Sequence, residues 1–218
     1  MGVIADYASL KSAIQTWAVR PDNTFGNQVP MFVEMAESRL YDGASEPGDP
    51  LHSGPLRSSI METTSTITLT DGVGPMPDDA LELRKVWVTD GQFGITYTPP
   101  ERFAELSAQS SGGAPIQFTV EAGTIKVMPR LTGSLDVTYY KRFPGIGPSN
   151  TTGPLLTQHG SIYLTAALVE AFTFLQQAQL AGAHLAKLKS MIAGVNRTSS
   201  ALLLPGLLRI RSRRVIGA

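Results

Sequence analysis

Apolar residues near the start of the chain recur every three or four positions, which is the spacing of an amphipathic helix. The first stripe lies within residues 6–20, follows the N-cap residue Asp6, and consists of Tyr7, Leu10, Ile14 and Trp17. The second belongs to a helix expected over residues 30–41 and consists of Val29, Phe32, Val33, Ala36 and Leu40. Glu34 and Glu37 fall on its opposite face, where we expect them to be solvated.

The pattern changes between residues 59 and 142, where β-branched residues alternate with turn dipeptides. Turns are expected at Asp71-Gly72, Asp90-Gly91, Ala122-Gly123 and Thr132-Gly133. The strands expected between them are Thr64–Leu69, Leu83–Val88, Gly94–Tyr97, Ile116–Val120, Thr124–Met128 and Ser134–Arg142. A short helix is expected only over residues 100–108. This spacing of short strands predicts a small antiparallel sheet or sandwich.

Helical periodicity returns after residue 154 and predicts helices over residues 156–177 and 179–195. Short amphipathic helices cannot bury their apolar faces alone, so we expect the early helices to pack on the late ones. The predicted core residues of this bundle are Leu10, Ile14, Trp17, Phe32, Val33, Leu40, Tyr163 and Leu168. The predicted fold class is α+β, an antiparallel bundle of about four helices with an inserted β domain and an extended C-terminal arm.

The same pattern divides the chain into four parts. Residues 1–58 form the first part of the bundle and contain an exposed loop at 42–55, which is rich in Pro and Gly. Residues 59–144 form the inserted β domain, and residues 145–200 complete the bundle. Residues 201–218 form a basic arm in which apolar residues and arginines alternate.

The arm is the candidate binding segment of the sequence. A segment that presents leucines and isoleucines among arginines is better suited to another chain than to water. We expect it to dock on another chain through Leu207, Leu208, Arg209, Ile210, Arg211, Arg213 and Arg214. Pairing with an edge strand of its own chain and plain disorder are the alternatives.

Composition adds a charge asymmetry to this picture. The 218 residues are 42% hydrophobic and 17% charged, and 18 basic residues balance 18 acidic ones. Residues 1–140 nevertheless contain 17 acidic and nine basic residues, whereas residues 171–218 contain seven basic residues and no acidic one. Opposite charges at the two ends can orient subunits during assembly.

No constellation in the sequence indicates catalysis or a bound cofactor. Cysteine is absent, which excludes disulfides and thiolate metal sites. The glycines near residues 145–150 do not complete a nucleotide-binding loop. His52, His159 and His184 lie far apart in the sequence and form no zinc motif, and Glu34 and Glu37 are explained by a solvated helix face. We therefore expect no catalytic residue, no metal and no cofactor.

The start of the chain lacks the basic and long apolar regions of a signal peptide. No run of about 18 apolar residues occurs either, so no membrane partner is expected. We expect a protein that is made and used without export, in which the glycosylation-like motifs at Asn150 and Asn196 carry no meaning.

Several segments, taken in order, resemble the head-to-tail adaptor proteins of tailed bacteriophages, also called connector or head-completion proteins. The likeness extends over about residues 6–195, although the loop at 42–55 and the arm at 201–218 depart from it. The segments that carry it are YASLKSAIQTW (7–17), RPD (20–22), VPMFVEMAESRL (29–40), MPDDALELRKV (76–86), IQFTVEAGTIKVMP (116–129), VTYYK (137–141) and IYLTAALVEA (162–171).

The resemblance implies a structural virion protein rather than an enzyme. Its subunits would form a twelve-membered ring beneath the portal, extend the DNA channel and provide the platform for a tail or nozzle protein. Genomic DNA would pass through the ring without sequence-specific binding. The protein would reside in the virion neck and, during assembly, in the host cytoplasm.

Two other functions stay open at this point. A peptidoglycan-cleaving tail enzyme would need two carboxylates that flank a sugar cleft, and a turbidity assay on cell walls would detect it. A DNA-binding protein could use the four arginines of the arm on phosphates, and a salt titration of DNA binding would detect that.

Overall fold

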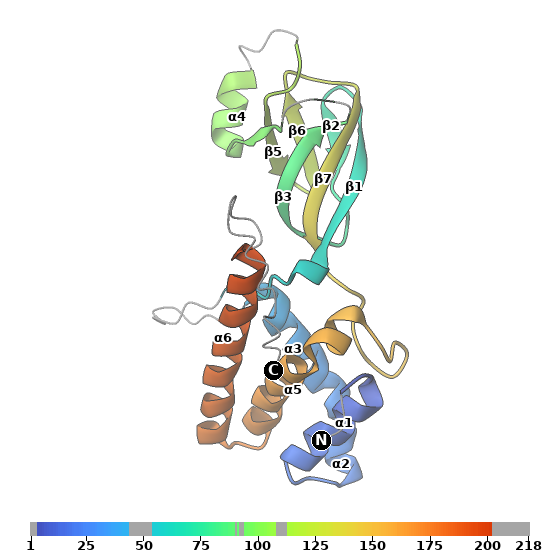
Figure 1. The fold of residues 1–218 in the computed structure, drawn as a ribbon, viewed down its shortest axis with the longest axis vertical. Coiled ribbons are helices and arrows are strands. Elements are labelled where there is room, and N and C mark those ends of the chain that lie inside the picture. The colour runs from blue at the N-terminus through green and yellow to red at the C-terminus, as the bar shows by residue number, and fades with distance from the viewer. Residues whose placement is uncertain (1–3, 44–53, 90, 92–93, 108–112, 202–218) are drawn as a thin grey trace, which may run out of the picture. The chain divides into compact units, whose positions relative to one another are not determined.

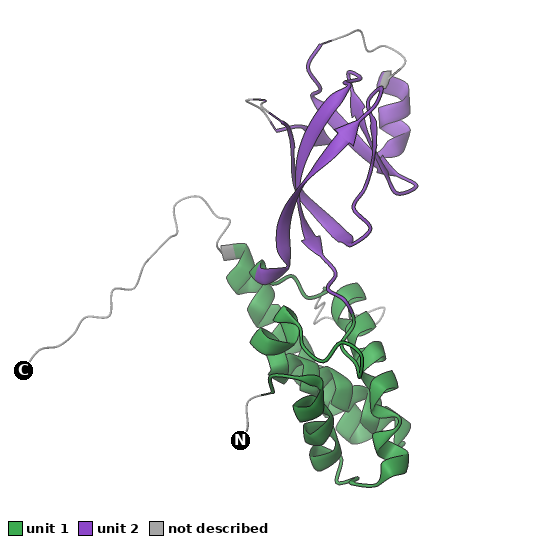
Figure 2. Cartoon of the chain, turned by 90° about the vertical axis from the view of Figure 1, so that its right-hand side faces the viewer, with its two compact units in different colours: residues 1–59, 145–218 green, residues 60–144 purple. Residues whose placement is uncertain are grey.

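The chain forms two compact units, one helical and one made mainly of strands. The computed structural model describes residues 4–43, 54–89, 91, 94–107 and 113–201. The helical unit contains the chain up to Ser59 and from Gly145 onward, and the β unit is Ile60–Pro144, coloured green and purple in Figure 2. The chain therefore leaves the helical unit once and returns to it.

The helical unit is built around its longest buried helix. α5 contacts α1, α3 and α6, and α1 also contacts the short α2 (Figure 1). Most positions of α5 are apolar and buried on every side, as expected for a helix at the centre of a unit. The helices are α1 (Tyr7–Trp17), α2 (Asn23–Gly26), α3 (Val29–Asp42), α5 (Pro154–Phe174) and α6 (Ala178–Ala201).

Local signals define where these helices begin. The Asp6 carboxylate accepts a hydrogen bond from the Ser9 backbone N–H at 2.8 Å, and the Ser9 side chain accepts one from the Asp6 N–H at 3.1 Å. This capping box starts α1, and the hydrogen bonds from Ser9 hold the pKa of Asp6 below its ordinary value. Asp22 caps α2 in the same way, through the Phe25 N–H at 2.9 Å.

The predicted bundle core and the structure differ at one residue. Trp17 is 42% exposed; it is the last residue of α1, and its ring meets the His184 ring of α6 edge to face. A large indole at a helix end is seldom buried completely. The other predicted core residues are all buried: Leu10, Ile14, Phe32, Val33, Leu40, Tyr163 and Leu168.

Glu37 also differs from its prediction. Its side chain was expected on a solvated face of α3, but it is only 9% exposed. It accepts hydrogen bonds from the Ile146 backbone N–H at 2.8 Å and from the Tyr163 hydroxyl at 3.2 Å. These partners come from parts of the chain more than 100 residues away, so the local pattern of α3 could not indicate them.

The β unit contains two small sheets. The three-stranded sheet has the order β1-β7-β3 and is antiparallel, and the four-stranded sheet has the order β2-β6-β5-β4. α4 (Pro100–Ser107) connects β4 to β5. The strands are β1 (Glu62–Leu69), β2 (Val73–Pro75), β3 (Ala80–Val88), β4 (Thr96–Tyr97), β5 (Gln117–Glu121), β6 (Thr124–Met128) and β7 (Gly133–Lys141).

Buried side chains from both sheets form one apolar core. They include Ile67 and Leu69 of β1, Leu135 and Val137 of β7, and Ile125 of β6. Alternate residues of β1, β6 and β7 thus meet in a core to which both sheets contribute.

The expected all-antiparallel pairing is wrong at one position, because β4 and β5 are parallel. Parallel neighbours need a crossover connection, and α4 provides it. Two short elements, α2 and β2, had no predicted counterpart, since three or four residues are too few to show a period. The expected loop at 42–55 falls largely outside the described residues, as do residues 202–218 of the expected arm.

Candidate interaction surfaces

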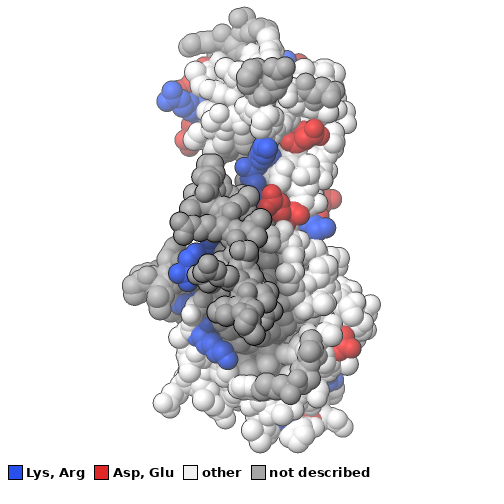
Figure 3. All heavy atoms as spheres, viewed as in Figure 1, with Lys and Arg blue, Asp and Glu red and all other residues white. Residues whose placement is uncertain are grey.

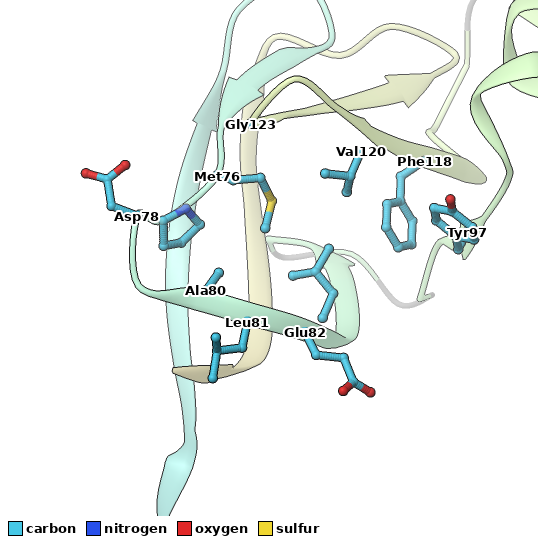
Figure 4. Close-up of a pocket in the computed structure, with 11 residues that line it drawn as sticks. Met76, Asp78, Ala80, Leu81, Glu82, Tyr97, Phe118, Val120 and Gly123 are labelled. Atoms are coloured by element: carbon cyan, nitrogen blue, oxygen red, sulfur yellow. The ribbon is translucent and has the colours of Figure 1, made fainter. Parts of the chain in front are cut away.

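The β unit has an apolar groove beside strand β3, which we call the β3 groove. Figure 4 shows Met76, Val120 and Phe118 directed toward the space over β3, whereas the carboxylates of Asp78 and Glu82 point away from these apolar side chains. The groove therefore has an apolar floor and an acidic rim. Its lining residues are Met76, Pro77, Asp78, Ala80, Leu81, Glu82, Leu83, Tyr97, Phe118, Val120 and Gly123.

Strand pairing explains why the groove is open. β3 lies at the end of its sheet and pairs with β7 on one side. On the other side, within the described residues, only Trp87 forms a bridge, to Gly94, and the Ile95 N–H bonds to the Val86 carbonyl at 3.0 Å. The edge of residues 80–85 is therefore not covered by another strand of the described chain.

Hydrogen bonds to β7 hold the acidic rim in place. The Tyr139 hydroxyl donates to the Asp79 carboxylate at 2.9 Å, and the Arg142 backbone N–H donates to the Asp79 carbonyl at 2.7 Å. Burial and the Asp79 carboxylate raise the pKa of Tyr139 to about 12, so its hydroxyl remains a donor at neutral pH. Asp79, which follows the rim residue Asp78, is thus held through both its carboxylate and its carbonyl.

A second groove, on the helical unit, has the opposite charge. Leu164 and Leu168 of α5 line it together with Trp17, His184 and Lys187. The Lys187 ammonium lies 5.9 Å from the centre of the Trp17 ring, and the His184 ring meets Trp17 edge to face at 6.2 Å. Lys187 is the only charged side chain in its lining among the described residues. In the face seen in Figure 3, blue basic side chains gather over α6.

Two further depressions among the described residues carry no net charge in their linings. The one near β6 contains two ion pairs, Arg130 with Asp71 at 2.6 Å and Lys126 with Glu121 at 2.6 Å. The one between α5 and α6 is lined by serines and other uncharged residues, and it includes Ser58 and His159.

Ser58 and His159 form a pair that resembles the beginning of a hydrolytic site. The Ser58 Oγ and the His159 Nε2 are 2.9 Å apart, and burial holds the pKa of His159 below its ordinary value. Ser58 is only 3% exposed, however, and no carboxylate of the described residues bonds to this imidazole. His159 also has non-helical backbone angles, φ −123° and ψ 37°, inside α5. The pair therefore ties the segment before the β unit to a kink in the central helix.

α6 holds the same segment at two further points. The Asn196 side chain accepts from the Arg57 backbone N–H at 2.7 Å and donates to the Pro55 carbonyl at 2.9 Å. The Ser199 hydroxyl accepts from the Ser59 N–H at 3.2 Å. Residues 55–59 are therefore fixed along the helical unit up to the point where the chain enters the β unit.

Of the residues predicted from the sequence to bind a partner, none lies within the described part of the chain. These residues are Leu207, Leu208, Arg209, Ile210, Arg211, Arg213 and Arg214. The β3 groove was not predicted, because it combines residues from three separate segments. The segment MPDDALELRKV (76–86), which carried part of the resemblance, contains both rim residues, Asp78 and Glu82.

In the described ranges, no group of three or more His, Asp or Glu side chains could hold a metal ion. Likewise, no described helix is both long and apolar enough to cross a membrane.

Comparison with known proteins identifies the class to which the chain belongs. Residues 5–209 match the SU10 adaptor protein family, and no curated protein matches the chain. Because the match covers almost the whole sequence, the chain belongs to the SU10 adaptor protein family, a family of phage adaptor proteins. The resemblance to phage head-to-tail adaptors is thereby confirmed, and it indicates a structural role in the virion with other phage proteins as partners.

Proposed function

We propose that this chain is the subunit of a closed ring of twelve copies that docks beneath the portal, extends the DNA channel and provides the platform for the tail or nozzle protein. The observation that carries the proposal is the family match over residues 5–209. In this account the ring lies in the virion neck and assembles in the host cytoplasm, and genomic DNA passes through it without sequence-specific contacts.

The surfaces of the two units support this proposal. A ring subunit needs complementary flanks toward its neighbours and separate surfaces toward the proteins above and below. The helical unit offers a basic groove beside Trp17 and exposed apolar side chains such as Met35 and Phe174. The β unit offers the acidic β3 groove. Two grooves of opposite charge on one subunit are suited to fixing its orientation in an assembly.

The division into units also supports an adaptor. The buried contacts of α5 give the helical unit a core of its own, and the two sheets give the β unit another. In our proposal one unit holds the ring together while the other contacts further virion proteins, and residues 207–214 dock on the portal or on the next subunit.

The protein composition of purified particles tests the proposal. Particles separated from free protein should contain this chain and the portal protein in equal numbers, as measured by quantitative mass spectrometry with isotope-labelled peptides. The tail protein should be lost from particles that are made without this chain. Mature infectious particles that lack the chain would refute the proposal.

A further inference from the structure

We infer that the β3 groove is the receptor for residues 207–214 of a second copy of this chain. The inference rests on the proposed ring, and it specifies a contact that joins one subunit to the next. It combines the shape and charge of the groove with the sequence of the C-terminal segment.

The groove and the segment match in their apolar residues. In an extended chain, alternate side chains point to opposite sides. Leu208 and Ile210 would therefore face one way and Arg209 and Arg211 the other. Two neighbouring aliphatic side chains suit a floor formed by the partly buried Met76, Leu83 and Val120 together with the buried Phe118.

Charge distinguishes the β3 groove from the other three depressions described above for this part of the chain. The β3 groove has two acidic residues and no basic one in its lining. The groove beside Trp17 has Lys187 and no acid, which would repel a basic segment. The charges near β6 are paired with each other, and the depression near Ser58 is uncharged. A segment with four arginines and no acid thus meets a favourable potential at the β3 groove.

The edge of β3 favours an extended partner. An uncovered strand edge can accept a peptide through main-chain hydrogen bonds. Two irregularities of register, between Ala80 and Glu82 and between Leu83 and Lys85, interrupt the ladder with β7 and limit a regular new ladder. We therefore assign most of the contact to side chains in the groove and a smaller part to the strand edge.

Ring geometry favours a second copy over the same chain. Each subunit has one C-terminal segment and one β3 groove, so it can give one contact and receive another. Repeated contacts of this head-to-tail kind close into a ring when the rotation permits. A segment that filled the groove of its own chain would contribute nothing to the ring.

The absence of cysteine makes a direct test possible. Particles are assembled with the full-length double variant Leu81→Cys and Ile210→Cys, treated with a short bismaleimide, and separated on a denaturing gel. We expect a ladder of dimers, trimers and larger species, because each link joins two copies. A link within one chain would give only a monomer of altered mobility, and that result, or no link at all, would overturn the inference.

The matched control places the first cysteine elsewhere on the same unit. Ile116 is 64% exposed and does not line the groove, so the variant Ile116→Cys with Ile210→Cys should give at least a severalfold weaker ladder. If this control gave an equally strong ladder, the cross-links would come from random collisions between chains rather than from docking in the β3 groove, and the inference would be overturned. If the double variant does not enter particles, the cross-link is read on concentrated, purified full-length chain.

A charge variant tests the rim. Adding Asp78→Lys to the cross-linking pair should lower the yield of the ladder severalfold at low salt and less at high salt. An unchanged yield at both salt concentrations would contradict the role of the rim. Absence of the wild-type chain from particles would refute the proposed function separately, since the cross-link can also be read on purified chain.

Discussion

Buried polar side chains hold the helical unit together at points where apolar packing alone would not define it. Glu37 joins α3 to the segment before α5 and to Tyr163. Burial and the nearby Glu37 carboxylate raise the pKa of Tyr163, so its hydroxyl stays protonated and donates. Arg39, two residues further along α3, pairs with the buried Glu170 of α5 at 2.7 Å. A buried carboxylate needs such partners, because an unpaired one would be costly.

Replacing Glu37 tests this network. Glu37→Leu removes the acceptor of the buried Ile146 N–H and one of the hydrogen-bond partners of the Tyr163 hydroxyl, which should cost about 2 to 4 kcal/mol of unfolding free energy. Glu37→Gln keeps an acceptor oxygen and should cost much less. Glu34→Leu, on the exposed side of the same helix, should change little. Denaturant titrations measure all three, and equal losses for the two Glu37 variants would contradict the network.

Histidine burial predicts how stability depends on pH. An unfolded histidine titrates near pH 6.5, whereas burial lowers the pKa of His159 in the folded chain. Between these two values the unfolded state binds more protons, so stability should fall as the pH drops below about 6.5. His184 should act in the same direction, because burial and Lys187 lower its pKa too.

Thermal unfolding between pH 7.5 and 5.5 measures this effect. The midpoint should decrease over this range, and His159→Gln should reduce the decrease while leaving the part due to His184. A midpoint that rises as the pH falls would show that the folded chain binds protons more tightly than the unfolded chain, and it would contradict the lowered pKa values of the histidines.

Helices, strands and turns were predictable to the extent that their signals are local. The turns at Asp71-Gly72 and Ala122-Gly123 have positive φ angles at both residues, as their dipeptides indicated. The direction of β4 relative to β5 was not predictable, because the residues of two short strands do not show whether the strands pair parallel or antiparallel. The burial of Glu37 and the exposure of Trp17 were not predictable either, because both depend on segments that are distant in the sequence.

Glycine substitutions separate tight contacts from open ones. A Cβ at Gly74 of β2 would lie 2.7 Å from the Thr68 carbonyl oxygen, so Gly74→Ala must displace β1 and should cost about 1 to 3 kcal/mol. At Gly133 of β7 the nearest atom would be Leu131 Cγ at 3.5 Å, an ordinary contact. Gly133→Ala should therefore be tolerated, and a comparison of thermal midpoints in which both variants lose equally would contradict this packing.

Across the whole chain, sequence patterns predicted the α+β class and the resemblance predicted the family, and both agree with the findings. The candidate binding surfaces were harder to predict from the sequence. The β3 groove forms because Met76, Leu83 and Val120 lie close together in space. Helical and strand periodicity do not predict such contacts between separate segments. The charge asymmetry between residues 1–140 and 171–218 was readable directly, because it needs only a count.

The arginines should act on assembly rather than on folding. Replacing Arg209, Arg211, Arg213 and Arg214 by Ser should reduce incorporation into particles in a salt-dependent way, since charges steer association. Removing residues 202–218 should abolish docking and leave the thermal midpoint of the remainder unchanged. Loss of folding in the shortened chain would instead make the segment an internal part of the fold, and normal infectious particles would remove its docking role.

Electron cryomicroscopy of the particle neck tests the central proposal most directly. The reconstruction should contain a closed ring of twelve copies directly beneath the portal, and the helical unit and the β unit should each fit its density as a separate body. A neck in which the portal contacts the tail directly, with no ring that fits either unit, would contradict the assignment of this chain as the adaptor.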